Sequence, residues 1–368
     1  MHNTTLALAL SGGGIRAMVF HAGVLLYLAE HSYLEKVSHI SSVSGGSLLV
    51  GMVYKFNNYH WPDSESYKNH IFESVKAELC SRNLQMAALF EVLKPSNWPN
   101  LLSRANVLAE AISKIWGVDA FMGDLGGYPL WSINATTAET GRRFRFKYDT
   151  CGDYSIGYSN AASFRLSQAM AVSAAFPGGI GPLQLETRRL TWRKRRRWED
   201  LEDMGEEVRL PYRKLHLYDG GVYDNLGMEP LFNPGNAQPK FEGVSVLVSD
   251  AGSPLPRGFS MFALNPFRLK RILDICMDQA RSLRVRSFME YLNTHNRGGG
   301  YLMIGQHPGE LLDNDQQLPF DGQTVEDVRT VTAYKTDLAK IGSSDFDRIA
   351  RHGYEVARAV DTLRGGLI

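Results

Sequence analysis

The sequence predicts an α/β fold with a central, mostly parallel sheet, and three observations support this prediction. Segments 5–28 and 37–56 each run from a short apolar strand through a glycine turn into an apolar helix, which is the pattern of parallel strands joined by crossover helices. A further apolar run at 243–250 indicates another buried strand. The other expected elements are strands near 131–148 and 213–218 and a mainly helical stretch over 57–120.

Length and composition indicate a globular protein with room for one large α/β domain or two smaller ones, and the order of the expected elements favours a single domain over residues 1–368. The chain is 44% hydrophobic and 21% charged, as ordinary globular proteins are. Its net charge of +1 argues neither for nor against nucleic acid, so a charged partner would have to be met by a local patch. No nucleic-acid partner is expected. Cys80, Cys151 and Cys276 are far apart and lack metal-binding spacing, so we expect neither a metal nor a cofactor. The sequence leaves the oligomeric state open.

The apolar segments are too short for a membrane span. No run approaches the roughly 20 apolar residues of a spanning helix, and no Lys or Arg precedes the first apolar strand, as a signal peptide would require. We therefore expect a soluble, cytoplasmic protein that contacts the inner membrane only peripherally.

The first glycine turn, Gly12, Gly13 and Gly14, lies between a strand and a helix. A helix start has unpaired backbone N–H groups and a partial positive charge, which suit an anion or a carbonyl oxygen that becomes one. Because glycines have no side chain, they allow such a negatively charged group to approach the backbone closely. The turn fits either the pyrophosphate of a dinucleotide or the oxyanion of an acyl-transfer enzyme, and its spacing alone does not distinguish them.

The second glycine turn favours acyl transfer. A dinucleotide site would have an acidic residue at the end of its second strand, whereas Ser44 and Gly45 stand there. The stretch from Ser42 to Gly46 matches the nucleophile-elbow pattern G-x-S-x-G with serine in place of the first glycine. Ser47 is the alternative nucleophile, but it lies inside the helix start and no glycine follows it.

A serine nucleophile needs a base, and an aspartate is the best candidate. The ten histidines form no catalytic motif, and structural or surface roles are expected for them. Asp219 ends a predicted strand and is followed by Gly220 and Gly221, which clear space beside its carboxylate. His216 is three residues earlier on that strand and therefore faces away from Asp219.

These features together resemble the patatin-like phospholipases, lipid acyl hydrolases that use a Ser–Asp dyad without histidine. The resemblance rests on the SGGGIRA opening, the serine elbow about thirty residues later and the distant Asp-Gly-Gly. It extends to WSINATTAETGRRFRF at 131–146, AMAVSAAFPGGIGPL at 169–183 and the C-terminal RHGYEVARAV. The resemblance implies a three-layer α/β/α patatin-like fold.

The resemblance also implies a role for each matching residue. Ser44 would be the nucleophile and Asp219 its general base, and Arg16 would steady the oxyanion loop or meet a lipid phosphate. The oxyanion and substrate-binding positions fall on Gly12, Gly13, Gly14 and Gly45. The positions that support the elbow and the base turn are Ser42, Gly46, Gly220 and Gly221.

The implied activity is phospholipase A-type hydrolysis of glycerophospholipid acyl esters at a membrane surface. Such an enzyme could damage its own membranes, so the resemblance also suggests a resting state switched on by a partner or a small anion. Two alternatives remain: an esterase or thioesterase acting on other acyl substrates, and a non-catalytic lipid- or nucleotide-binding protein.

Three segments are open to more than one interpretation. The helical stretch 57–120 is either a lid over an acyl groove or a packing layer on the sheet. The charged insertion 186–212 has seven basic residues at 188–197, flanked by Trp192 and Trp198. It is a solvated excursion, a patch for anionic lipid headgroups with inserted Trp, or the site of a negatively charged activator. The basic helix 266–292 either packs on the sheet or lies on a membrane.

Overall fold

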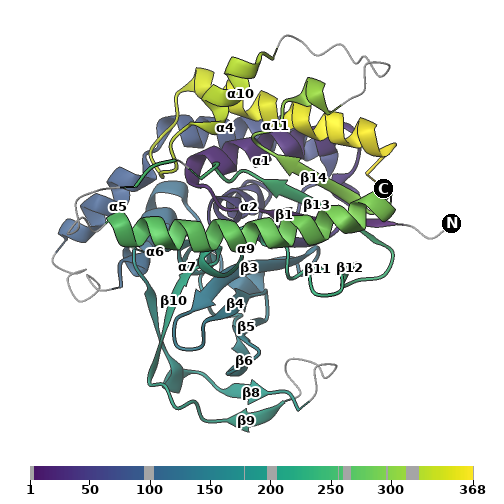
Figure 1. Cartoon of the computed structure of the whole chain (residues 1–368). Helices are drawn as coiled ribbons and strands as arrows, with labels where there is room; N and C mark the ends of the chain where they lie inside the picture. The colour runs from purple at the N-terminus through teal and green to yellow at the C-terminus, as the bar shows by residue number, and fades with distance from the viewer. Residues whose placement is uncertain are drawn as a thin grey trace.

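A mixed sheet of twelve strands forms the centre of the computed structural model (Figure 1). The structure describes residues 4–94, 103–177, 179–196, 205–255, 257–259, 267–295, 297–311 and 323–367. Five neighbouring strands pair in parallel, in the order β14 (Gly299–Met303), β13 (Val244–Asp250), β1 (Thr5–Leu10), β2 (Val37–Ser42) and β3 (Leu130–Thr137). The prediction of an α/β fold around a mostly parallel central sheet is confirmed.

Antiparallel strands extend the sheet beyond β3. They are β4 (Arg142–Phe146), β5 (Thr150–Asp153), β6 (Gly157–Asn160), β8 (Trp192–Lys194) and β9 (Glu206–Val208). A second antiparallel branch begins at β3. In this branch β10 (Lys214–Asp219) pairs antiparallel with β3 and with β7 (Leu183–Glu186). The strands β11 (Phe232–Asn233) and β12 (Gln238–Pro239) form a separate pair. Because β10 runs opposite to β3, Asp219 at its end comes to lie opposite Ala135.

Helices cover both faces of the sheet, so the three-layer α/β/α fold is confirmed. Along β1, Leu6, Leu8 and Leu10 face a core that includes α1 (Gly14–Glu30), α2 (Gly45–Phe56) and α11 (Ser343–Arg364). The alternate residues Ala7 and Ala9 face the other core, which includes residues of α9 (Phe267–Thr294). In Figure 1, α9 crosses in front of the strands.

The stretch predicted as mainly helical, 57–120, is mainly helical where it is described. It contains α3 (Ser64–Ser66), a π-helical turn (Tyr67–Ile71), α4 (Phe72–Ser81), α5 (Leu84–Leu93) and α6 (Arg104–Trp116). The remaining helices include α7 (Leu166–Ser173), α8 (Gly221–Asp224) and α10 (Val325–Thr332). Helix α4 packs on α2 and α11, and α6 packs on α7, so these two helices belong to the packing layer. Helix α5 differs, because Met86, Leu89, Phe90 and Leu93 are exposed along one of its faces.

The charged insertion forms the two short strands β8 and β9 at the far edge of the sheet. Trp192 is only 3% exposed, and its indole N–H donates to the carbonyl oxygen of Thr187 at 3.0 Å. The alternative in which Trp192 inserts into a membrane is therefore contradicted, because its ring packs in the core. Trp198 and Arg197 lie outside the described residues. Among the described helices, none combines the length and apolarity that crossing a bilayer requires.

Candidate active site

Ser44 lies on the tight turn between β2 and α2. Its backbone has φ 49° and ψ −119°, a conformation that side-chain-bearing residues rarely adopt. Gly45 and Gly46 leave no space for a Cβ atom, which would collide with the carbonyl oxygens of Gly14 and Leu10 respectively. The turn is therefore strained and packed directly against the first glycine turn, as a nucleophile elbow requires.

Hydroxyl groups beneath the elbow hold it in place. The Ser44 N–H donates to Ser173 Oγ at 3.0 Å, and Ser173 Oγ donates to the Asn134 carbonyl oxygen at 2.7 Å. Ser47 Oγ lies 2.8 Å from both Ser173 Oγ and Ser42 Oγ. Because Ser47 is fully buried within this network, it lacks the access that a nucleophile needs, whereas Ser44 is half-buried.

Asp219 lies at the end of β10, near enough to Ser44 for the serine side chain to act on the pKa of its carboxyl. Its carboxylate is 3% exposed and accepts a hydrogen bond from the Gly221 N–H at 2.7 Å. Burial raises the pKa of Asp219 from 3.8 to about 7, although hydrogen bonds from Gly221 and the Ser44 side chain act to lower it. A carboxylate with this pKa is a far better base at neutral pH than an ordinary aspartate.

The first glycine turn lies beside the serine. A Cβ atom on Gly12 would lie 3.1 Å from Ser44 Cβ, and the Gly12 N–H donates to the Asn225 carbonyl oxygen at 3.0 Å. The turn continues through Gly13 at φ 148° and Gly14 at φ 61°, values that favour glycine. The N–H groups of these two residues donate to no described residue. The N–H groups of Gly13 and Gly14 are therefore available to a bound anion or oxyanion, whereas the N–H group of Gly12 already donates to Asn225.

Arg16 supports the loops around the turn. Its side chain is 2% exposed and donates to the carbonyl oxygens of Ala251 at 3.0 Å and Tyr334 at 2.6 Å. Burial lowers the pKa of Arg16 to about 10, against the opposing effect of Asp250. A guanidinium buried among carbonyl oxygens fits the loop-steadying role and does not face solvent, where a lipid phosphate would approach.

Two histidines near the site residues in sequence are engaged elsewhere. His21 is fully buried between Ser249 Oγ at 2.7 Å and the Ser11 carbonyl oxygen at 3.0 Å, and burial lowers its pKa to about 4. His216 lies 2.6 Å from Glu139. Within the part of the chain that the structure describes, no three His, Cys, Asp or Glu side chains are grouped as metal ligands.

The fold and the site define a class of protein. A serine on a strained strand-to-helix turn, beside a buried carboxylate and a glycine turn, is consistent with a serine hydrolase. A family model described as patatin-like phospholipase matches residues 8–232, so the chain belongs to this family. Membership implies a lipid acyl hydrolase in general terms. No curated protein matches the chain.

Solved structures of a human enzyme share the fold at low sequence identity. Human GIVD cytosolic phospholipase A2 has a TM-score of 0.53 and 15% identity, over 99% of this chain and 61% of the human chain. The same human enzyme in complex with methyl gamma-linolenyl fluorophosphonate has a TM-score of 0.51 and 13% identity, with coverages of 99% and 59%. VipD from Legionella pneumophila has a TM-score of 0.42 and 14% identity, with coverages of 98% and 67%. The chain thus spans 61% of the human enzyme's length.

Proposed function

We propose that the protein is a phospholipase A-type enzyme that hydrolyses glycerophospholipid acyl esters through Ser44 and Asp219. The observation that carries this proposal is the proximity of a strained, accessible serine to a buried carboxylate whose pKa lies near 7. Family membership supports the lipid substrate class.

The chemistry has two halves. Asp219 accepts the proton of Ser44 as Oγ attacks the ester carbonyl, and the protonated carboxyl then returns the proton to the departing lysolipid alkoxide. Water, deprotonated by Asp219, next attacks the acyl-serine carbonyl; the bond to Ser44 Oγ breaks, Asp219 returns the proton to Oγ, and the fatty acid is released. No histidine is required, because the raised pKa lets one carboxyl act as both base and acid.

The oxyanion formed in each half needs hydrogen-bond donors. The N–H groups of Gly13 and Gly14 are the best candidates, because they open the first turn of α1 without described partners. Gly45, directly after Ser44, is a third candidate. Each donor of this kind typically lowers the barrier by about 3 to 4 kcal/mol.

We further propose peripheral contact with a phospholipid surface through α5. Its exposed residues Met86, Leu89, Phe90 and Leu93 follow the i, i+3, i+4, i+7 spacing of one helix face. The Gln85 N–H donates to the Leu338 carbonyl oxygen at 2.9 Å, and the neighbouring Asp337 packs on Gly14. The apolar face is thus carried on a helix that is braced against the oxyanion turn.

The first experiment is mass spectrometry after exposure to methyl gamma-linolenyl fluorophosphonate, the compound bound in the human structure. An adduct on Ser44 is expected in the wild type, and much slower labelling in Asp219→Asn. Ser47→Ala is the matched control and should label at the wild-type rate. An adduct on Ser47, or none on folded protein under any condition tested, would contradict the proposed dyad.

The substrate class is tested by competition among substrates. Phosphatidylcholine vesicles, a triacylglycerol emulsion and an acyl-coenzyme A are offered to the wild type, with Ser44→Ala as the blank. Preferential release of fatty acid from the vesicles supports the proposal, and preference for another substrate would reassign the enzyme to the esterase or thioesterase alternative. Repeating the assay with candidate protein partners and small anions tests whether the enzyme rests in an inactive state that one of them activates. Tight ligand binding without turnover would favour the non-catalytic alternative.

A further inference from the structure

A cleft of about 300 Å³ opens on strands β2, β3 and β4 and the segment 230–241. Five cationic side chains line it: Arg143, Arg145, Lys147, Arg195 and Lys240. None of its described lining residues is acidic. A cavity of this size lined by one sign of charge concentrates counter-ions, and none of the chemistry proposed for Ser44 uses it.

The strand pattern explains this accumulation of charge. In the run RRFRFK the cationic residues Arg143, Arg145 and Lys147 alternate with Phe144 and Phe146. Successive side chains of a strand face opposite sides, so the two phenylalanines are buried in the core while the cations share the other face. The sequence thus places three positive charges side by side without an intervening carboxylate.

Two of the cations form no salt bridge with a described residue, although the carboxylates of Glu229 and Asp224 act on both from nearby and work to raise their pKa. Arg143 donates to the neutral Asn134 side chain at 3.3 Å, and burial and then Arg145 lower its pKa. Lys240 forms no ion pair with any described residue, and its pKa is lowered to about 8, first by desolvation and then by Arg143. Like charges held close together in a desolvated site are costly unless an anion joins them.

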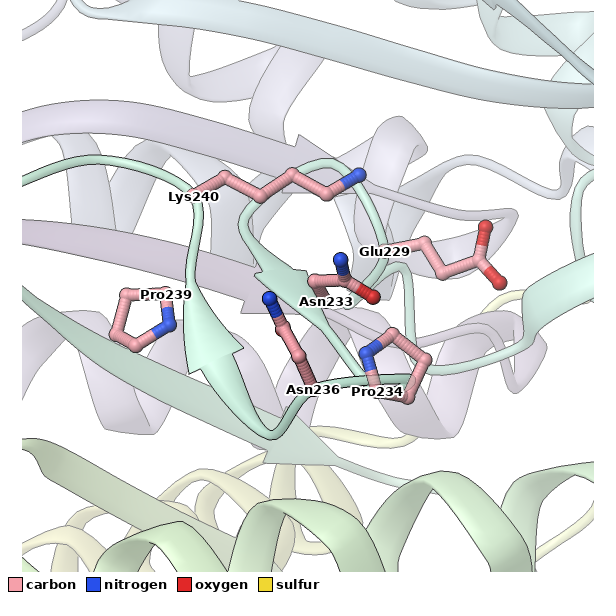
Figure 2. A pocket seen from close by; sticks show the side chains of 6 residues that line it. All are labelled: Glu229, Asn233, Pro234, Asn236, Pro239 and Lys240. Carbon is pink, nitrogen blue, oxygen red and sulfur yellow. The ribbon is translucent and has the colours of Figure 1, made fainter.

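Lys240 also borders an adjoining pocket of about 440 Å³ (Figure 2). Figure 2 shows its side chain extending above Asn233, with the ammonium group on the side of Glu229. Glu229 forms an ion pair with Arg284 at 3.1 Å, so its charge is shared with another partner. Lys240 is therefore positioned to contact a ligand from either pocket.

We propose that this cleft binds a phosphorylated anion, with Arg143 and Lys240 as its principal contacts. Guanidinium and ammonium groups converging on one cavity suit the several oxygens of a phosphate. The phosphate group belongs either to a free molecule or to a lipid headgroup. The cleft also has a short connection to the elbow, because Asn134, the partner of Arg143, donates to the Ser42 carbonyl oxygen at 2.9 Å.

The test compares Lys240→Gln with the control Lys68→Gln, which makes the same charge change at a position outside the cleft. Isothermal titration calorimetry with inorganic pyrophosphate and with inositol trisphosphate tests free ligands. Co-sedimentation with phosphatidylcholine vesicles, with and without phosphatidylinositol 4-phosphate, tests the headgroup, using Ser44→Ala variants so that lipid is not consumed. Because these are binding measurements, their result does not depend on whether the protein is a hydrolase.

The expected result is at least a fivefold weaker affinity in Lys240→Gln and unchanged affinity in Lys68→Gln, in one arm or both. Loss in calorimetry alone identifies a free ligand, and loss in sedimentation alone identifies a lipid headgroup. Absence of binding to every probe, or equal weakening in the two variants, would overturn the proposal. Thermal unfolding of both variants checks that Lys240→Gln remains folded.

Discussion

Asp219→Asn should make the protein more stable at alkaline pH while removing its activity. In the native state the carboxyl keeps its proton up to pH about 7, whereas its usual pKa is 3.8. Between these two values the native state binds more protons than the unfolded state, so stability falls as pH rises. Above pH 7 the full penalty of burying the charge is present.

The size of this penalty follows from the pKa. The rise from 3.8 to about 7 corresponds to about 4 kcal/mol of native-state destabilisation at pH 8. Asparagine carries no charge at any pH and can still accept the Gly221 hydrogen bond through its amide oxygen. The stability gain of Asp219→Asn over the wild type should therefore grow by about 3 kcal/mol between pH 5 and pH 8.

Urea denaturation of both proteins at pH 5, 6, 7 and 8 measures this gain. Glu73→Gln, which removes an exposed carboxylate outside the site, is the control and should stay within about 0.5 kcal/mol of the wild type. In parallel, wild-type kcat/KM should rise with pH and level off above about 7, because Asp219 must be ionised to accept a proton. A variant less stable than the wild type at pH 8, or a gain that does not grow with pH, would refute this reasoning.

Three further predictions concern the surroundings of the dyad. Gly45→Ala should lower kcat at least a hundredfold, because the new methyl group pushes the glycine turn away from Ser44; steady-state kinetics on a soluble ester measure this. The double variant Phe90→Ser and Leu93→Ser should lose at least tenfold of its vesicle hydrolysis but keep soluble-ester hydrolysis, whereas Leu363→Ser, an exposed leucine on α11, should keep both. Arg16→Lys should cost about 2 to 4 kcal/mol in urea denaturation, because an ammonium cannot satisfy the same separate carbonyl oxygens.

Much of the fold and both members of the proposed dyad follow from local patterns. The glycine turns ended apolar strands and began apolar helices, so the positions of Ser44 and Asp219 at the ends of strands were predictable from sequence. The sequence pattern of β10 does not indicate whether the strand runs parallel or antiparallel to its neighbours. Its antiparallel course, which brings Asp219 to the elbow, depends on pairing with β3 and β7 instead of on its own residues.

The residues beneath the elbow were not singled out. Ser173 and Asn134 lie about ninety or more residues from Ser44, and no spacing rule links a hydroxyl on one helix with the backbone of another turn. Asn134 and Ser173 fall within segments that resemble the family, and this resemblance was the signal that could have pointed to them. For Trp192 the sequence left several interpretations open. Aromatic residues among arginines are typical of a membrane interface, but this ring packs in the core.

Some of the contacts that support the first glycine turn, Gly12 to Gly14, come from outside residues 8–232, the segment that the family model matches. Gly14 packs on the backbone of Asp337, and the Ile15 N–H donates to the Asp337 carbonyl oxygen at 2.8 Å. These contacts, like one end of the Arg16 side chain, lie about a hundred residues beyond the family match at 8–232. The proposed dyad and part of the scaffold that aligns it therefore come from different parts of the chain. A chimera that exchanged only residues 8–232 with a relative would carry Ser44 and Asp219 but would have to rebuild the contacts with Asp337.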